Sequence, residues 1–215
     1  MTRDHIIVLP GGGYRHHSAH EGAPVAEWLR GLGLESSVFE YPVATRHPGP
    51  LDAIRAEVAR VRDAGAGRVG VLGFSAGGHA GALAAVAPGA EPSERVDLVI
   101  LGYPVVSMLL PTHAGSRQNL LGSKPSDAER AATSVDLLVT PAAPPFFIWH
   151  TAEDAAVPVQ HSYLLGMALA AAGVGHALHV FPLGAHGLGF AEGSGDAARW
   201  TTLCAEWLRE EGWIE

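Results

Sequence analysis

The fold is decided by residues 69–80, which read VGVLGFSAGGHA. The first four residues are apolar or glycine and predict a short buried strand, and a helix is expected from Ala80 onward. Between them lies GFSAG at 73–77, a Gly-x-Ser-x-Gly turn that presents its serine above a sheet when it joins a strand to a helix. Its glycines have no Cβ to clash, so strand and helix can pack closely. We therefore expect Ser75 in a strained backbone conformation at a helix N-terminus, where the dipole favours negative charge.

Short apolar segments and segments of helical period alternate along the chain. We expect strands at 6–9, 37–41, 69–72, 98–101, 146–150 and 176–181, most of them apolar on both faces. Helices are predicted after Pro24 and Pro50 and over 80–86, 159–172 and 197–208. Strands buried on both faces and separated by helices favour an α/β fold, a three-layer, doubly wound and mostly parallel sheet of about six strands.

One domain spanning 1–215 is expected, because the length matches the usual size of a single domain. The exception to the strand–helix alternation is 105–145, which contains THAGS at 112–116, a short predicted helix after Ser126 and a proline-rich segment at 141–145. A connection of this length inside a compact domain is usually functional. We expect a small lid-like insertion near 105–145.

Composition and charge exclude several classes of protein. The chain has 14 Lys and Arg against 22 Asp and Glu, a formal charge of -8, and no basic cluster, so no nucleic-acid partner is expected. Its one cysteine, Cys204, allows neither a disulfide within the chain nor a Cys-based zinc site. No apolar run approaches the length of a membrane span, and the N-terminal apolar stretch is too short for a secretory leader. We expect a cytoplasmic protein without membrane contact.

A run of glycines at 10–14 (PGGGY) directly follows the first predicted strand. Without side chains in the way, its backbone N–H groups can point inward and stabilise negative charge. We expect an oxyanion hole in which the N–H of Gly12 or Gly13 acts with that of Ala76. A phosphate-binding loop is one alternative, but the Gly-x-Gly-x-x-Gly spacing and a Walker lysine are both missing. A plain turn is the other alternative.

An acid and a histidine complete the order Ser, Asp, His along the chain. Asp154 follows the predicted strand at 146–150 and His186 follows the one at 176–181, so both lie at the carboxyl ends of strands, where α/β sheets place their sites. Asp154 would orient the imidazole of His186, which would take the proton of Ser75. Glu153 is the rival acid, and the structural alternative for Asp154 is an N-cap before the next helix.

Several others of the 12 histidines are expected to have structural roles. His79 should pack on its helix, and His150 and His179 lie in predicted strands as core or surface residues. A histidine cluster after the glycine run could bind a metal, but a His-Glu-x-x-His spacing is missing, so no metal is expected at His16, His17 and His20.

Residues 18–21 (SAHE) have the spacing of a helix capping box. Pro24 would then lie well inside the helix, where proline is costly. A short turn followed by a helix that starts at Pro24 fits better. We therefore expect Ser18 and Glu21 to brace the glycine run.

Together the motifs resemble those of the α/β-hydrolases, specifically the small esterases of the acetyl-xylan esterase and acetylesterase-like group. The shared segments are PGGGY at 10–14 with Glu21-Gly22, GFSAGGH at 73–79, YPV at 103–105, THAGS at 112–116 with NLLG at 119–122, HTAEDAAVPV at 150–159 and GAHGLG at 184–189. The resemblance spans nearly the whole chain and is more specific than any single motif.

The resemblance implies the catalytic residues Ser75, Asp154 and His186 and the oxyanion-hole residues Gly12, Gly13 and Ala76. The chain departs from the resemblance in one respect: typical α/β-hydrolases have further strands before the glycine loop, whereas this sequence starts almost at that loop. We therefore expect a trimmed α/β-hydrolase fold that lacks the N-terminal strands. At that edge of the sheet we expect an exposed strand or a homodimer contact. Related enzymes also act on other esters, lactones, formamides and peptides, because the fold alone does not set the substrate.

We expect the protein to hydrolyse a small-molecule ester without a cofactor. Acetyl is the acyl group expected first, because a small lid leaves little room for a long acyl chain. A formamidase, a lactonase or a small peptidase would use the same triad, and a non-catalytic ligand-binding module on a hydrolase scaffold is the alternative from another class. We expect Tyr14, Tyr103, His113 and Phe190 to form walls of the pocket. Aromatic residues are equally often part of the core, so a core position is the alternative for each.

Overall fold

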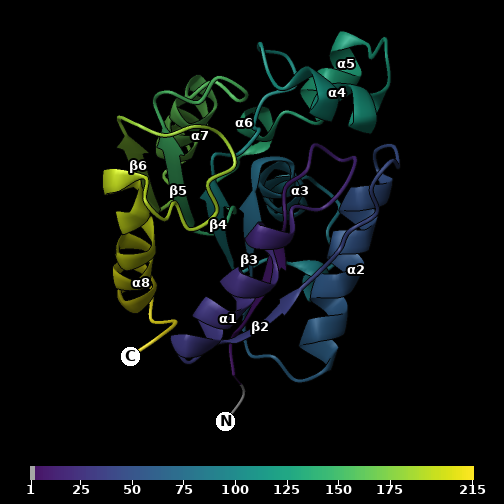
Figure 1. The fold of residues 1–215 in the computed structure, drawn as a ribbon. Coiled ribbons are helices and arrows are strands. Elements are labelled where there is room, and N and C mark those ends of the chain that lie inside the picture. The colour runs from purple at the N-terminus through teal and green to yellow at the C-terminus, as the bar shows by residue number, and fades with distance from the viewer. Residues whose placement is uncertain (1–2) are drawn as a thin grey trace.

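The centre of the molecule is a six-stranded sheet in which every pair of neighbouring strands is parallel (Figure 1). The computed structural model describes residues 3–215. Along the sheet the strands follow the order β2-β1-β3-β4-β5-β6. The bounds are β1 His5–Leu9, β2 Glu35–Val38, β3 Val69–Phe74, β4 Leu98–Gly102, β5 Phe146–Thr151 and β6 His176–Phe181. The predicted doubly wound parallel sheet is confirmed.

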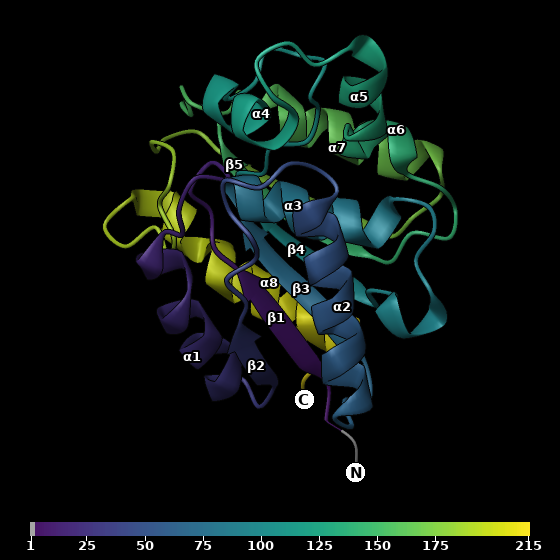
Figure 2. The same cartoon turned by 90° about the vertical axis from the view of Figure 1, so that its right-hand side faces the viewer.

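Helices cover both faces of the sheet (Figure 2). One face carries α1 (Ala23–Gly31) and α8 (Trp200–Glu210), and the other carries α2 (Gly49–Asp63), α3 (Ser75–Val86) and α7 (Gln160–Ala171). All five predicted helices are present; α3 begins five residues earlier than expected because the serine turn passes directly into the helix. No helix among residues 3–215 is both long and apolar enough to cross a bilayer. The cytoplasmic location stays a prediction.

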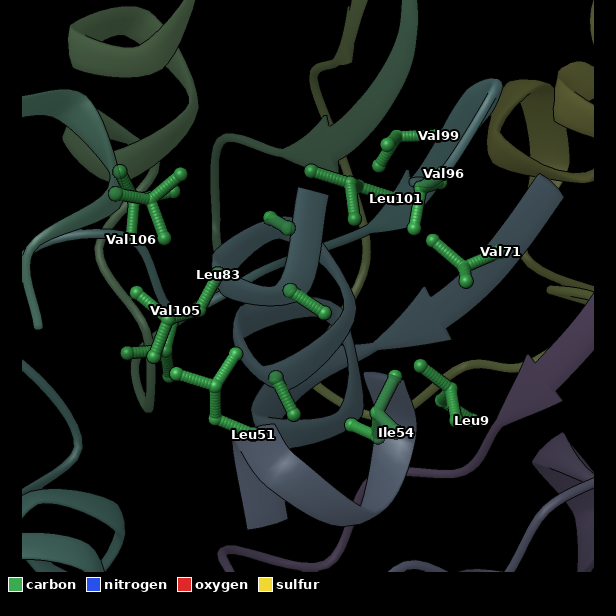
Figure 3. Close-up of a cluster of buried hydrophobic side chains, with 14 of the residues drawn as sticks. Leu9, Leu51, Ile54, Val71, Leu83, Val96, Val99, Leu101, Val105 and Val106 are labelled. Carbon is green, nitrogen blue, oxygen red and sulfur yellow. The ribbon is translucent and has the colours of Figure 1, made fainter. Parts of the chain in front are cut away.

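Alternate residues of the central strands enter two separate cores. In β1, Ile7 and Leu9 join the core under α2 and α3, whereas Ile6 and Val8 join the core under α1 and α8. Figure 3 shows part of the first core, where Leu9 lies among aliphatic side chains from other elements. Burial of both faces explains why the strands are continuously apolar.

The edge strand β2 differs from its prediction, which placed it at 37–41. Pairing with β1 starts at Glu35, opposite His5, and the strand ends at Val38. An edge strand can be polar and half-buried. Residues 35–37 (ESS) therefore form most of the strand, although their composition does not predict one. The apolar Tyr41 instead leaves the sheet and donates a hydrogen bond from its hydroxyl to the Pro10 carbonyl at 2.9 Å. A homodimer contact at this edge stays a prediction.

The long connection between β4 and β5 contains three short helices: α4 (Ala114–Leu121), α5 (Asp127–Ala132) and α6 (Val135–Leu138). The helix expected after Ser126 is α5, and a capping box in which Ser126 and Glu129 bond each other's backbone starts it. α4 and α6 were not predicted from the sequence. In Figure 1 the connection lies beyond α3, at the end of the sheet where the strands finish. Its function as a lid stays a prediction.

The strand order creates a crevice between β1 and β3. After β1 the chain continues to β2 on one side, and after β2 it returns to β3 on the other side. Leu9, the last residue of β1, lies opposite Gly73, which precedes the serine turn. The glycine run and Ser75 therefore leave neighbouring strands at the position where α/β sheets bind ligands.

Candidate active site

Ser75 lies on a sharp turn between β3 and α3, as the Gly-x-Ser-x-Gly spacing predicts. Its φ is 52°, a left-handed conformation that is strained for a residue with a side chain. Gly77 permits the turn because a Cβ there would lie 2.1 Å from the Leu9 carbonyl oxygen. Strand and helix are thus in backbone contact, and the Ser75 hydroxyl stands at the first turn of α3.

The structure brings Ser75, His186 and Asp154 into one hydrogen-bonded chain. Ser75 Oγ lies 2.8 Å from His186 Nε2. On the other side of the ring, His186 Nδ1 lies 2.6 Å from Asp154 Oδ2. The rival acid, Glu153, points elsewhere and accepts a hydrogen bond from the Gly184 amide at 3.2 Å.

Asp154 is buried and accepts hydrogen bonds on both carboxylate oxygens. Oδ1 accepts from the amides of Ala156 at 2.9 Å and Val157 at 2.8 Å. Oδ2 accepts from His186 and, at 3.1 Å, from His150 Nε2. Burial by itself raises the pKa of this carboxyl, but the hydrogen bonds from His150, His186 and Val157 outweigh it and hold the pKa well below its usual range. Asp154 is therefore a carboxylate at neutral pH.

The glycine loop, residues 11–13, has two amides that point away from the carbonyl groups through which the loop accepts hydrogen bonds. The Gly11 carbonyl accepts from the Ser18 amide at 3.0 Å, and the Gly12 carbonyl accepts from the amides of Arg15 and His16. In a trans peptide the N–H points opposite to the carbonyl, so the amides of Gly12 and Gly13 face the other way. Within residues 3–215 neither amide has a hydrogen-bond acceptor. Gly12, with φ 126°, must be glycine, since a Cβ would lie 2.1 Å from the His16 carbonyl oxygen.

Side chains from two other segments, Asn119 and His79, fix the glycine loop and the adjacent Tyr14. Asn119 of α4 donates from Nδ2 to the Gly13 carbonyl at 2.8 Å. The Tyr14 hydroxyl donates to His79 Nδ1 at 2.6 Å, and His79 Nε2 donates to the Thr133 carbonyl at 2.7 Å. Complete burial lowers the pKa of His79 to about 4, so the ring is neutral and its two nitrogens can have these opposite roles. The connection between β4 and β5 is thereby joined to the loop at two points.

A cleft of about 370 Å³ opens beside Ser75 and His186. No aliphatic or aromatic hydrocarbon side chain among residues 3–215 lines it. The lining consists of glycines and polar side chains, namely Gly12, Gly13, Arg15, His16, Ser18, Glu21, Ser75, His113, Gly115, Asn119, His186 and Gly187. The side chains at the cleft therefore offer hydrogen-bond donors and acceptors to a bound ligand.

Of the four expected pocket walls, His113 lines the cleft and the other three do not. Tyr14 and Tyr103 are buried behind it, each 1% exposed, with their hydroxyls hydrogen-bonded to protein groups. Phe190 packs against Trp28 and Trp200. For Tyr14 and Tyr103 the difference arises because they follow strands that are covered on both faces, where a buried aromatic residue is favoured.

Three residues with contacts to the site were not assigned to it from the sequence: His150, His79 and Asn119. His150 was expected to be a core or surface residue, yet it is the second histidine on Asp154. The i to i+4 spacing of His150 and Asp154 across the end of β5 was a usable signal. For His79 and Asn119 the sequence carries no such signal, because their partners are more than fifty residues away.

The histidines after the glycine loop do not converge on a common point. His17 stacks edge-on against Tyr41, with ring centroids 4.9 Å apart, and His20 Nε2 donates to the Gly187 carbonyl at 3.0 Å. Within residues 3–215 no group of three or more His, Cys, Asp or Glu side chains could hold a metal ion.

The fold and this arrangement define the class of protein. A six-stranded parallel sheet with a serine turn after β3, a glycine loop after β1 and a histidine after β6 is an α/β-hydrolase. More specifically, the chain belongs to the BD-FAE family, whose model matches residues 59–169, just over half of its length.

Known proteins of similar sequence and structure agree with this assignment. An acetyl ester-xyloside bifunctional hydrolase from Caldicellulosiruptor lactoaceticus has a similar structure, with 38% identity and a TM-score of 0.94 over 100% of this chain and 85% of that one. Endo-1,4-beta-xylanase B of Butyrivibrio fibrisolvens is 37% identical over 208 residues, and an acetylxylan esterase of Xylanibacter ruminicola is 33% identical over 202 residues. The matches cover 87% and 86% of this chain but only 33% and 41% of those two proteins.

Proposed function

We propose that the chain is a serine esterase that removes short acyl groups, acetyl first, from sugars or small alcohols. The observation that carries the proposal is the hydrogen-bonded chain from Ser75 through His186 to Asp154, with distances of 2.8 and 2.6 Å, beside a cleft with polar walls. Relatives described as an acetylxylan esterase and an acetyl ester-xyloside hydrolase support the same class of substrate.

In the proposed reaction Ser75 Oγ attacks the ester carbonyl while His186 Nε2 takes the hydroxyl proton. The carbonyl oxygen becomes an oxyanion and accepts hydrogen bonds from the amides of Gly12, Gly13 and Ala76. Ala76 belongs to the first turn of α3, whose amides have no acceptor within the helix. Each such donor typically contributes about 10²–10³ in rate.

Collapse of the tetrahedral intermediate then breaks the bond to the alcohol, which leaves with the proton from His186. Water attacks the acyl-Ser75 ester with His186 again as the base, and the acid is released. Asp154 stays ionised throughout, orients the ring and stabilises the imidazolium, in keeping with its lowered pKa.

The lining of the cleft supports a short acyl group and a polar leaving group. A long acyl chain gains affinity by burying its methylenes, at about 0.8 kcal/mol each, but this requires apolar walls. Sugar hydroxyls instead need hydrogen-bond partners, and Arg15, His113 and Asn119 offer them. The cleft thus favours an acetylated carbohydrate over a lipid ester.

The test is hydrolysis of p-nitrophenyl acetate, butyrate and octanoate by the wild type, by Ser75→Ala and by a control, Ser123→Ala, which removes an exposed serine of the β4–β5 connection. We expect turnover to fall steeply with chain length, to vanish in Ser75→Ala and to be unchanged in the control. Acetylated xylo-oligosaccharides would then be compared with acetylated small alcohols.

Other outcomes distinguish the alternative functions. Labelling of Ser75 by a fluorophosphonate without hydrolysis of any ester would favour an amide or lactone substrate, which N-formyl and lactone substrates would identify. Neither labelling nor turnover would favour a ligand-binding module on a hydrolase scaffold.

A further inference from the structure

Glu21 is a buried carboxylate that the proposed reaction does not use. Its side chain is 2% exposed and belongs to the lining of the cleft. Among residues 3–215, Glu21 and Asp154 are the only acidic residues in the buried class. A buried charge is costly unless hydrogen bonds compensate it, so the partners of Glu21 indicate why it is there.

Both oxygens of Glu21 accept hydrogen bonds from groups next to the site. Oε2 accepts from the Gly11 amide at 2.8 Å, which holds the start of the glycine loop. Oε1 accepts from the Tyr103 hydroxyl at 2.6 Å. Burial and the nearby Glu21 charge raise the pKa of Tyr103 well above its usual value, so the phenol keeps its proton and donates it to the carboxylate.

Tyr103 connects Glu21 to the loop that carries His186. Because its only proton goes to Glu21, the Tyr103 oxygen accepts, and the Gly189 amide donates to it at 2.8 Å. The Tyr103 ring also packs edge-on against the His186 ring, with centroids 5.0 Å apart. Tyr103 has φ 37°, a strained conformation for a residue with a Cβ, which aims its side chain between the two loops.

The hydrogen bonds thus converge on Glu21 from both sides and join two distant segments. On one side they pass from the Gly189 amide to the Tyr103 hydroxyl and on to Glu21, which also holds the Gly11 amide. The far side of the His186 loop is held separately, because Trp200 Nε1 donates to the Gly189 carbonyl at 3.0 Å.

We propose that Glu21 and Tyr103 are a pair of positioning residues that set the distance between the oxyanion-binding amides and His186. This inference rests on the proposed esterase function and assigns the pair no contact with the substrate. The oxyanion and the general base must be held to within a fraction of an ångström, since a misplacement of about 1 Å can cost 10²-fold in rate. A single buried pair that bonds both loops provides that constraint.

The test is a double-mutant cycle with Glu21→Gln and Tyr103→Phe, using p-nitrophenyl acetate. The Gln amide has one acceptor and one donor, so it cannot accept from both Gly11 and Tyr103, and one donor faces another donor. Removing the Tyr103 hydroxyl as well removes that conflict. We expect each single variant to lose about tenfold or more in kcat, and the double variant to be about tenfold more active than the product of the two losses predicts.

Three readouts separate positioning from a merely structural role. Values of kcat are given per active site titrated with a fluorophosphonate, so unfolded protein does not count, and thermal melting is measured beside them. We expect KM to change little, because the Glu21 side chain is only 2% exposed and both of its oxygens are already hydrogen-bonded to protein groups. If Glu21→Gln does not fold, Tyr103→Phe alone must still lower kcat at constant KM.

The control is Tyr41→Phe. It removes a buried hydroxyl that donates to the Pro10 carbonyl, directly before the glycine loop, and that makes no hydrogen bond to Glu21 or to the His186 loop. Its effect should multiply with that of Glu21→Gln. Three results would overturn the inference. The effects of Tyr103→Phe and Glu21→Gln on kcat could multiply, kcat could stay unchanged in the single variants, or the change could be confined to KM. Turnover that persists in Ser75→Ala would instead overturn the proposed function, so the two failures are distinct.

Discussion

His150 Nε2 lies 3.1 Å from Asp154 Oδ2, the same oxygen that accepts a hydrogen bond from His186. His150 Nε2 also lies 3.0 Å from the Val157 carbonyl, which can only accept, so this nitrogen carries a proton. On the other side of the ring, His150 Nδ1 bonds the Ser162 hydroxyl at 2.8 Å. The carboxylate is therefore held by a second histidine that is fully buried and has no access to the cleft.

Replacement of His150 should lower turnover by loosening Asp154. In His150→Leu the buried carboxylate loses one donor, a change that costs about 1–3 kcal/mol. The pKa of Asp154 should rise, since one of the hydrogen bonds that favour its charged form is lost, and the carboxylate should hold the His186 ring less firmly. His150→Gln, whose amide can donate from nearly the same position, should be closer to the wild type. Values of kcat/KM at neutral pH test this, and equal values in all three proteins would contradict it.

Asp154→Asn should reduce kcat by about 10⁴-fold, because an amide in place of the carboxylate favours the wrong tautomer of His186. The matched control is Glu153→Gln, the neighbouring acid, which bonds only the Gly184 amide. Its change should be within about twofold, as expected for a substitution at an exposed position. A large loss in Glu153→Gln with activity retained in Asp154→Asn would reverse the assignment of the acid.

Asn119→Ala should lower kcat by misplacing the glycine loop, since it removes the hydrogen bond from Nδ2 to the Gly13 carbonyl. We expect a loss of about tenfold, near the value of one net hydrogen bond to the loop. Asn119→Asp should lose more, because its carboxylate would face the carbonyl oxygen. Gln118→Ala, at the adjacent exposed position of α4, is the control and should behave as the wild type. Equal activity of all four proteins would show that α4 does not hold the loop.

Acid should destabilise the fold through His79. Burial of the ring disfavours its charged form, so the pKa of His79 is about 4 in the folded state against 6.5 for the free residue. Protonation would also place an N–H on Nδ1, which accepts from the Tyr14 hydroxyl. Between these pH values the unfolded chain binds more protons, and stability therefore falls as the pH falls. The shift corresponds to a loss of about 3 kcal/mol.

Urea unfolding between pH 7 and pH 4 measures this loss. His79→Gln should be less stable at neutral pH, because the Tyr14 hydroxyl loses its acceptor, but its stability should fall less steeply over the same range. Parallel curves for the two proteins would assign the acid sensitivity to other groups.

The sequence was most informative where local spacing carries the constraint. The serine turn and the capping box at Ser126 each depend on residues close together in the chain, and the structure places both as expected. The order Ser75, Asp154, His186 was inferred from the loops that follow three predicted strands, and the structure brings these residues together. The sequence was less informative where pairing with a neighbouring strand sets the bounds of an element. The edge strand β2 begins at Glu35 because the backbone of β1 pairs with it, and its polar composition gives no period to detect.

The parallel sheet, the turn that presents Ser75 and the expectation that Glu21 braces the glycine loop follow from the sequence alone, because hydrophobic period and glycine placement act over short distances. The way in which the loops are joined, Glu21 to Tyr103 and His150 to Asp154, is visible only in the folded chain. Glu21 and Tyr103 are 82 residues apart in the chain. They meet because the strand order places the ends of β1, β3 and β4 side by side, and no local pattern encodes which buried donor will reach which buried acceptor.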